Sequence, residues 1–310
     1  MSVLVTGSGG HLGSVLLPRA RDAFGAAWGT VSLGGRRPPD QEVLAVDLRE
    51  PAALVERVLV ERPRTIVHLA AISRVADAWR DPIRAHEVNV LSTAELTALA
   101  GRVGARLVLA STEMVFDGRG APYDEAATPH PRTQYGRTKL AAESHVLGYR
   151  QGVVVRLPLL LGIPPLAPAG GHLAELAHAF AKGPPARLFE DEYRTPMSLA
   201  NAADALIKIA GAPGLTGIVH VAGIERVSRL ELGLRWAKSL GVVPRYEAVR
   251  AADLELPEPR PPDLSMTTGR YQAYFGALPS QALDDALADC ASDLRRHQQA
   301  PDGPAPVEQG

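Results

Sequence analysis

Short apolar runs alternate with amphipathic helical patterns along the first half of the chain. The apolar runs predict strands near residues 2–6, 29–33, 43–46, 65–70, 106–110 and 152–156, with helices between them. The runs at 31–33, 66–69 and 107–109 are mostly apolar on both faces, which is typical of parallel strands with helices on either side. The pattern therefore predicts an α/β protein built on a doubly wound parallel sheet.

The pattern changes at Pro158. Seven prolines stand between residues 158 and 196, which indicates that the chain leaves the sheet to build a second, smaller part of the molecule. Helical patterns follow at 172–182, 228–240 and 280–296. Residues 298–310 contain three prolines and almost no apolar side chains, so we expect a disordered tail there.

The first predicted strand runs directly into a turn with Gly7, Gly10 and Gly13, and a helical pattern follows. Glycines at this spacing let the backbone turn tightly, admit a pyrophosphate close to the main chain, and let the helix pack near the strand. The amides at the helix start would hold the anion, and His11 and Leu12 lie beside it. Because a strand precedes this turn and a helix follows it, the turn predicts a Rossmann dinucleotide-binding domain.

Tyr135 and Lys139 stand four residues apart within one predicted helix, so their side chains share a face. An ammonium beside a phenol favours ionisation of the phenol, whose usual pKa is about 10, and the pair can serve as a proton donor. The same spacing also occurs on ordinary helix surfaces, where a lysine chain covers an aromatic ring. The glycine turn at the start of the chain favours the chemical interpretation.

Together these motifs resemble the extended short-chain dehydrogenase/reductase superfamily, and most of all its dTDP-4-dehydrorhamnose reductase-like branch. The likeness runs from Met1 to about Leu287, and its segments follow in the family's order. The matching segments are 6–13, 47–48, 68–71, 88–89, 110–118, 122–125, 135–139 with Glu143, Arg156, 191–196 and 260–263.

The resemblance implies a discontinuous division into domains. The NADP-binding Rossmann domain would comprise residues 1–157 and 200–222, because the chain returns for a helix at about 202–209 and a strand at 217–221. A smaller C-terminal substrate-binding domain would comprise residues 158–199 and 223–297.

The resemblance also implies cofactor contacts beyond the glycine turn. Asp47 and Leu48 would meet the adenine edge, and Ala70, Ala71 and Asn89 would contact the cofactor further along. Taken without the resemblance, Asp47 could equally cap the helix predicted to start near residue 50.

The end of the second predicted strand distinguishes the two nicotinamide cofactors. A carboxylate there would accept hydrogen bonds from a free ribose 2'-hydroxyl, whereas an arginine would pair with a 2'-phosphate. The sequence has Arg36 and Arg37 and no carboxylate, which favours NADP, bound as NADPH, over NADH. The alternative is that both arginines are solvated loop charges.

By resemblance, Thr112, Tyr135 and Lys139 are the catalytic residues. Reduction of a ketone needs a hydride on carbon, and a proton and a hydrogen bond on the developing alkoxide. Tyr135 would be the acid, and Thr112, at the end of the fifth strand, would donate the second hydrogen bond. Lys139 would lower the pKa of Tyr135 and hold the nicotinamide ribose. A Ser-Thr pair at a strand end is otherwise typical of a turn or a helix cap.

Glu113, Met114 and Arg194 are the substrate-binding candidates. The reductase branch usually has Asp and Tyr where this chain has Glu113 and Met114, and a Trp where leucines follow Arg156. Two substrate-facing aromatic positions are thus aliphatic, so the substrate can differ from the usual dTDP-sugar. Met114 also argues against a 4,6-dehydratase, which carries a carboxylate at that position.

We therefore expect an NADPH-dependent reductase of a ketone, most simply a 4-keto group on a nucleotide-linked sugar. A non-catalytic NADP-binding regulatory subunit, like the methionine adenosyltransferase partner in this branch, is one alternative. A nucleotide-sugar epimerase is another, and it would recycle its cofactor. A homodimer is a possible assembly.

Charge and composition are those of a soluble enzyme. The 33 basic and 34 acidic side chains, net charge -1, give no support to nucleic acid or a membrane as the partner. No apolar segment approaches the ~20 residues of a membrane span, and the single cysteine, Cys290, fits a reducing cytoplasm. His68 and His220 lie in apolar runs and are expected to be buried imidazoles, and no metal site is predicted.

Overall fold

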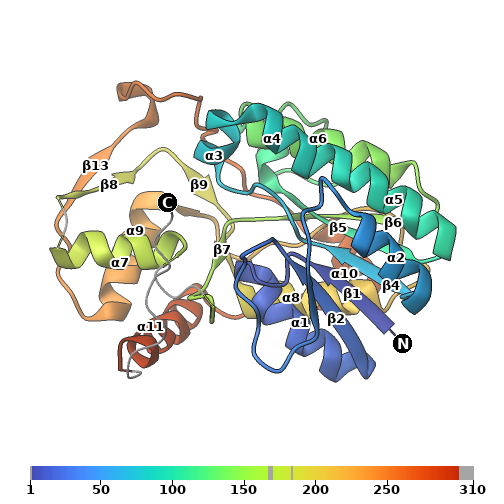
Figure 1. Cartoon of the computed structure of the whole chain (residues 1–310). Helices are drawn as coiled ribbons and strands as arrows, with labels where there is room; N and C mark the ends of the chain where they lie inside the picture. Colours follow the sequence, from blue (N-terminus) through green and yellow to red (C-terminus); the bar gives the residue numbers. More distant parts are fainter. Residues whose placement is uncertain (1, 167–169, 183, 300–310) are drawn as a thin grey trace.

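The computed structural model describes residues 2–166, 170–182 and 184–299, and within them the centre is a sheet of seven parallel strands (Figure 1). The strands are β1 Ser2–Thr6, β2 Ala26–Val31, β3 Val43–Ala45, β4 Thr65–His68, β5 Arg106–Thr112, β6 Gly152–Leu157 and β11 Gly217–His220. Their order is β11-β6-β5-β4-β1-β2-β3. The strand order reverses beside β1, so the predicted doubly wound α/β fold is confirmed.

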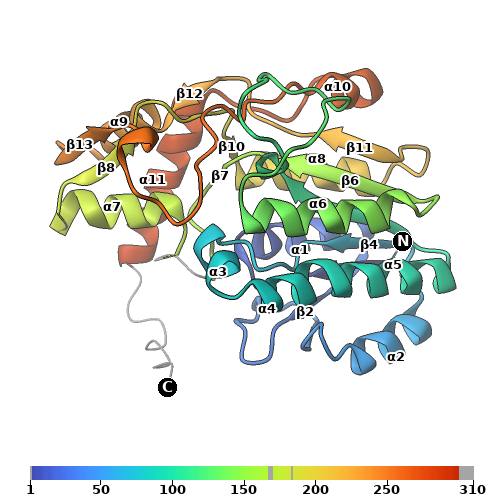
Figure 2. The same cartoon turned by 90° about the horizontal axis from the view of Figure 1, so that it is seen from above.

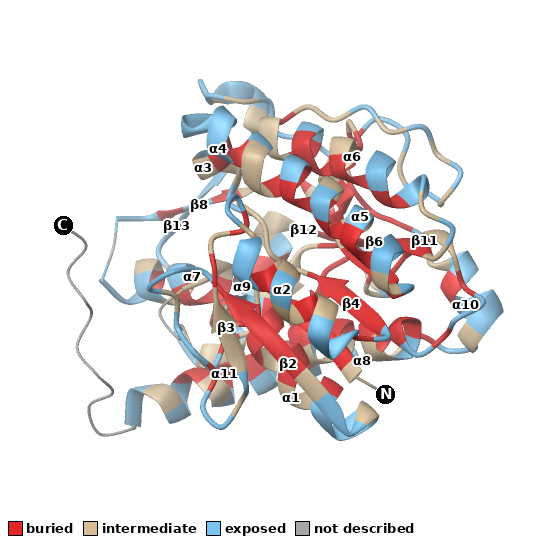
Figure 3. Ribbon diagram, turned by 45° about the vertical axis from the view of Figure 1, so that its right-hand side comes forward, coloured by how far each residue is buried: buried red, intermediate tan, exposed pale blue. Residues whose placement is uncertain are grey.

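Helices cover both faces of this sheet because its strands are apolar on both faces. Val3 and Val5 of β1 pack in one core with helices α1 (His11–Phe24) and α8 (Leu199–Ala210). Leu4 points the other way and packs in a second core. That core contains helices α2 (Ala52–Glu61), α5 (Ser92–Val103) and α6 (Gln134–Leu147). Figure 3 shows buried residues throughout the central strands, which is why continuous apolar runs predicted them.

Shorter helices connect the larger elements. They are α3 (Val75–Arg80), α4 (Pro82–His86), the π-helix η1 (Glu87–Leu91), the 3₁₀-helices η2 (Glu113–Val115) and η3 (Ala251–Asp253), and α10 (Gly269–Phe275). Both η1 and η2 lie against α6 and so help to position the start of that helix.

A second group of elements lies to the left of the sheet in Figure 1. Helices α7 (His172–Lys182), α9 (Arg229–Leu240) and α11 (Leu283–Gln299) enclose a separate core around Leu232, Trp236 and Leu287. Three strand pairs complete it: β7 (Leu160–Leu161) with β10 (Met197–Ser198), β9 (Tyr193–Arg194) with β12 (Val227–Ser228), and β8 (Ala186–Phe189) with β13 (Tyr246–Val249). The chain enters this group after β6, returns for α8 and β11, and enters it again; the exact domain bounds stay a prediction.

The predicted helices of the second group exist, with small differences at their ends. Helix α7 has the predicted bounds, and α9 begins one residue later than predicted. The predicted tail began too early, because residues 298 and 299 still belong to α11, which is anchored by buried leucines at 283, 287 and 294. Residues 300–310 lie outside the described part of the chain. No helix within the described ranges is long and apolar enough to cross a membrane.

Candidate active site

A cleft of about 1390 Å³ runs along the carboxyl ends of the sheet strands. One side is built from the segments that follow β1 to β6. The other side is built from α7, α9 and the proline-rich residues 256–261, which we call the strap. Figure 2 shows α7 and α9 beside the end of the sheet that carries α3 and the start of α6. Ligands of doubly wound proteins bind at this edge.

The glycine turn between β1 and α1 is packed too closely for side chains. Gly7 has φ +69°, and a Cβ there would lie 2.8 Å from the backbone N of Ala70. A Cβ on Gly13 would lie 2.2 Å from the carbonyl O of Gly7, so helix and turn are in direct contact. Helix α1 begins after Gly10 without a side-chain cap, which leaves its first amides available to an anion.

His11 and Leu12 begin α1 and both line the cleft. Although His11 is exposed, partial burial of its ring and then the Arg74 guanidinium lower its pKa. A Cβ on Gly171 would lie 2.9 Å from Cε1 of His11, so the second group of elements approaches the glycine turn here. Arg74 and Glu175 of α7 form an ion pair across the same opening.

The two arginines after β2 are placed differently. The Ser32–Gly35 turn closes with a hydrogen bond from the Gly35 N–H to the Ser32 carbonyl of 2.8 Å. It holds Arg36 against the glycine turn, since a Cβ on Gly9 would lie 2.4 Å from the carbonyl O of Arg36. Arg36 lines the cleft, and Arg37 is not among the lining residues.

Asp47 and Leu48 follow β3 and line the cleft, and their contact with the adenine edge stays a prediction. The Asp47 carboxylate pairs with Arg49 at 2.6 Å and accepts its backbone N–H at 3.0 Å, and these bonds lower the pKa of Asp47. The alternative role as a cap is not observed, because α2 begins at Ala52 and Asp47 does not bond to its first turn.

Ala70 and Ala71 line the cleft, but Asn89 does not. The buried Asn89 amide accepts a hydrogen bond from the Ile72 N–H at 2.8 Å and donates to the Ile72 carbonyl at 3.1 Å. It also donates to the Thr138 hydroxyl on α6 at 2.9 Å. Asn89 therefore ties the loop after β4 to α6 and supports the wall of the cleft from behind.

Thr112, Tyr135 and Lys139 all line the cleft. Thr112 ends β5, and its hydroxyl acts to lower the pKa of the Tyr135 phenol. The Thr133 hydroxyl caps α6 by accepting the Gly136 N–H at 3.1 Å, which fixes where the helix begins. A Cβ on Gly136 would lie 2.3 Å from the carbonyl O of Met114, so only glycine lets α6 lie this close to the end of β5.

The pKa of Tyr135 differs from the sequence expectation. Burial raises the pKa of Tyr135 to about 12, the Thr112 hydroxyl opposes the increase, and the nearby Glu113 carboxylate adds to it. Lys139 was expected to lower this pKa and does not contribute. Burial instead lowers the pKa of Lys139 to about 8, and Glu143 acts against that decrease. The phenol therefore keeps its proton at neutral pH.

Glu113 and Arg194 meet across the cleft. The buried Glu113 carboxylate lies 3.1 Å from Nε of Arg194, and Arg194 also donates to the Tyr193 carbonyl at 2.6 Å and the Pro261 carbonyl at 3.2 Å. Burial raises the pKa of Glu113 to about 7 despite the opposing effects of Arg194 and Arg229. Met114 lines the cleft next to this pair.

Four further polar side chains line the substrate side and were not singled out as site residues. Arg229 lies 3.0 Å from Nδ1 of His172, and burial lowers the pKa of Arg229 to about 10. Arg260, on the strap, pairs with the fully buried Glu192 at 2.9 Å. The Arg-Pro segment at 260–261 was the available signal for Arg260. Arg229 lies in an ordinary amphipathic helix pattern and gave no signal.

The buried histidines are bonded within the protein. The His68 ring contacts the Thr6 hydroxyl at 2.7 Å and the Thr93 hydroxyl at 3.0 Å, and burial lowers the pKa of His68 to about 3. His220 is buried beside Arg156. Within the described residues, no three His, Cys, Asp or Glu side chains gather in a way that could hold a metal ion.

A doubly wound sheet with Thr112, Tyr135 and Lys139 at its carboxyl edge is the arrangement of an extended short-chain dehydrogenase/reductase. The family model described as RmlD substrate binding domain matches residues 1–296, and the chain belongs to this family, within the dTDP-4-dehydrorhamnose reductase-like branch of that superfamily.

Two curated relatives carry different names. The chain is 29% identical over 297 residues to a dTDP-4-dehydrorhamnose reductase of Mycobacterium tuberculosis, covering 92% of this chain and 91% of the relative. It is 28% identical over 246 residues to methionine adenosyltransferase 2 subunit beta of Xenopus laevis, covering 77% and 72%. The relatives that are named as reductases support the assignment of this chain to the NAD(P)-dependent oxidoreductases.

Solved structures share the fold. A dTDP-4-dehydrorhamnose reductase from Bacillus anthracis in complex with NADP has a TM-score of 0.79 at 20% identity, covering 94% of this chain and 99% of that one. MoeE5 in complex with UDP-glucose and NAD has a TM-score of 0.83 at 23% identity, covering 96% and 100%.

Proposed function

We propose that the protein reduces a ketone with NADPH, and that the ketone is a 4-keto group on a nucleotide-linked sugar. The observation that carries the proposal is that Thr112, Tyr135 and Lys139 line the same cleft as the uncapped start of α1. The candidate proton donor, Tyr135, and the candidate dinucleotide site at the start of α1 thus line the same cleft. When bound, NADPH supplies the hydride.

Tyr135 delivers the proton to the developing alkoxide. A proton donor must be protonated before the alkoxide of the substrate develops, and the raised pKa of Tyr135 keeps the phenol protonated at neutral pH. Thr112 gives the same oxygen a second hydrogen bond from the end of β5. Lys139, with its ammonium in the cleft one turn further along α6, holds the ribose next to the nicotinamide.

The glycine turn with the start of α1 suits a pyrophosphate, and Arg36 beside it suits a 2'-phosphate. The close-packed glycines and the free amides of α1 admit an anion at the backbone, and Arg36 lies against the same turn. Arg36 gives this end of the cleft a guanidinium for the 2'-phosphate, in agreement with the relative solved with NADP.

The opposite wall suits an anionic substrate. Arg194, Arg229 and Arg260 line it together with Glu192 and Glu113, and Glu113 is partly neutral near pH 7. This excess of positive over negative charge favours an anion such as the diphosphate of a nucleotide sugar. MoeE5, with the same fold, was solved with UDP-glucose.

The decisive experiment compares wild type, Tyr135→Phe and Tyr123→Phe for NADPH oxidation with a panel of 4-keto nucleotide sugars and simple ketones. Tyr135→Phe should bind NADPH normally and lose about 10²- to 10⁴-fold in turnover. Tyr123 is the matched control, since its buried phenol bonds to Asp117 at 2.8 Å outside the cleft. Equal rates for wild type and Tyr135→Phe would refute the role of Tyr135.

Cofactor preference has its own test. Arg36→Ala should weaken NADPH binding by about 10- to 150-fold, which corresponds to a charge-assisted hydrogen bond of about 1.5–3 kcal/mol, and leave NADH binding nearly unchanged. Arg37→Ala is the matched control and should have little effect, because Arg37 does not line the cleft. A wild-type preference for NADH would contradict the proposal.

The second candidate is a cofactor-binding regulatory subunit. The similarity to methionine adenosyltransferase 2 subunit beta favours it, as do Met114 and the leucines after Arg156 in place of aromatic residues. Under this alternative, wild type binds NADPH but oxidises it with no ketone in the panel. An epimerase would convert its sugar without net oxidation of added NADPH.

A further inference from the structure

A buried ion pair includes a carboxylate on the same helix as Lys139. Glu143 is one turn further along α6, and Arg156 is on β6. Nε of Arg156 lies 3.0 Å from Oε1 of Glu143, and Nη2 lies 2.8 Å from Oε2, so the contact is bidentate. Ser111, the register partner of Arg156 on β5, also donates its hydroxyl to Oε1. The Arg156 and Glu143 side chains are 2% and 1% exposed, so water does not screen them.

Lys139 is buried one helical turn from this carboxylate on α6. Lys139 is 2% exposed, and within the described residues its ammonium makes no hydrogen bond to the protein. Burial disfavours the ammonium, and Glu143 is the group that opposes this effect. The other titratable groups near Lys139 are His68 on β4, which is neutral between two threonine hydroxyls, and Tyr135, which is protonated.

We propose that Glu143, clamped by Arg156, is a positioning residue that keeps Lys139 protonated at neutral pH. Arg156 fixes the carboxylate and partly neutralises it, so Glu143 and Arg156 act on Lys139 in opposite directions. The importance of this charge for catalysis rests on the proposed function, in which the Lys139 ammonium holds the cofactor. The electrostatic claim itself is measured without cofactor or substrate.

The competing explanation is an ion pair that serves stability alone. Removing either partner of a buried pair leaves the other uncompensated, so stability falls in both variants. Stability loss does not separate the explanations, whereas the titration of Lys139 does. A structural pair predicts no shift or shifts of the same sign. The proposed role predicts that Glu143→Gln lowers the pKa of Lys139 and that Arg156→Gln raises it.

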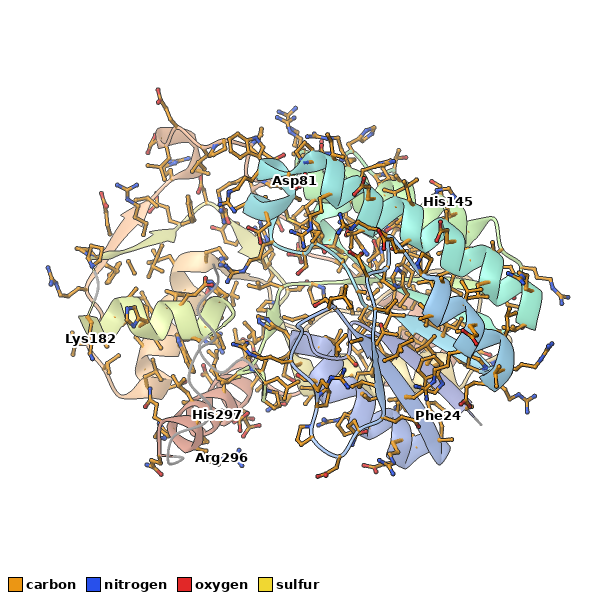
Figure 4. The ribbon with its side chains drawn as sticks, viewed as in Figure 1. Phe24, Asp81, His145, Lys182, Arg296 and His297 are labelled. Atoms are coloured by element: carbon orange, nitrogen blue, oxygen red, sulfur yellow. The ribbon has the colours of Figure 1, made fainter. Side chains whose placement is uncertain are left out.

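The chain permits a direct measurement because it contains only four lysines, at 139, 182, 208 and 238. Lys182, Lys208 and Lys238 are exposed and serve as internal references. Figure 4 shows Lys182 at the end of α7 in the second group of elements. Protein labelled with ¹³C at the lysine ε-carbon gives one titrating signal per residue by NMR, and Lys139→Met identifies the signal of Lys139.

In wild type the Lys139 signal should titrate near pH 8. Glu143→Gln should lower the midpoint by about one unit or more, and Arg156→Gln should raise it. Glu143→Asp, which keeps the charge, should stay close to wild type. Ser111→Ala removes one hydrogen bond to the same carboxylate without removing charge, and should leave the midpoint unchanged. Equal midpoints in wild type and Glu143→Gln, or shifts of the same sign in Glu143→Gln and Arg156→Gln, would overturn the proposal.

If Arg156→Gln does not fold, the pair Glu143→Gln and Glu143→Asp decides the question. The dissociation constant of NADPH against pH then connects the charge to the site: Glu143→Gln should bind poorly at pH 8 and recover as the pH falls. If wild type reduces no ketone, the proposed function fails, but the lysine titration still decides this inference. If ketone reduction is confirmed and Glu143→Gln titrates like wild type, only the inference fails.

Discussion

The Glu113 carboxyl should make the folded protein less stable as the pH rises. Its side chain is buried beside Arg194, and one of its oxygens, Oε2, has no hydrogen-bond partner within the described residues. Such a group is easier to bury with its proton than without it. Glu113→Gln keeps the shape, cannot ionise, and therefore removes this pH dependence.

The magnitude follows from the change in pKa. Glutamate in the unfolded chain has a pKa near 4.5, and burial raises the pKa of Glu113 to about 7 in the folded protein. The folded protein then binds the proton more tightly between these values, so its stability falls as the pH rises through them. At about 1.36 kcal/mol per unit, the shift corresponds to a loss of about 3 kcal/mol, complete above the folded pKa.

Denaturant unfolding of wild type and Glu113→Gln from pH 4 to pH 9 measures this effect. The variant should gain about 3 kcal/mol relative to wild type between the two ends of the range. The cost of leaving Arg194 without its carboxylate is the same at each pH and cancels from this change. Glu225→Gln is the control with opposite sign, because bonds from the Leu283 N–H and Arg235 lower the pKa of Glu225. A stability difference between wild type and Glu113→Gln that does not vary with pH would refute the reasoning.

Gly9→Ala should weaken NADPH binding more than NADH binding, because the new Cβ would lie 2.4 Å from the carbonyl O of Arg36 and displace that turn; equal losses in titrations of the two cofactors would contradict it. Trp236→Phe should lower the free energy of unfolding by about 1–3 kcal/mol, since the indole donates to the Leu173 carbonyl at 2.9 Å inside a buried core; an unchanged denaturation midpoint would contradict that value. Removing residues 300–310, which have little apolar surface, should change the melting temperature by less than about 2 °C, and a larger decrease in calorimetry would show that they dock.

The sheet could be predicted from the sequence because burial on both faces leaves a plain signal. Strand β6, for example, is buried at every position and reads as a continuous apolar run around Arg156. The strand pairs of the second group gave no such signal. Three of the four residues of β13 are exposed, so its sequence carries no alternation that marks a strand.

The candidate site was predictable where local spacing determines geometry. Tyr135 and Lys139 share a helix, and Thr112 ends a strand, so helix and sheet geometry bring them to one edge. Asn89 was predicted to contact the cofactor, but its amide hydrogen-bonds to Ile72 and Thr138 instead. These bonds depend on contacts between separate elements, which local spacing does not predict. The pKa of Tyr135 also lay beyond sequence reasoning, since burial in the assembled cleft outweighs its neighbours along the helix.

The pairing of β11 with β6 has a consequence for synthesis of the protein on the ribosome. Strand β6 ends at Leu157, and the strand that covers its outer edge begins only at Gly217. At ~5–20 residues per second, translation of the intervening segment takes roughly 3 to 12 seconds. During that interval a nascent chain would present an apolar strand with unpaired backbone amides and carbonyls, open to pairing with a neighbouring chain. Until residue 220 is made, this edge is where chaperone protection would matter most.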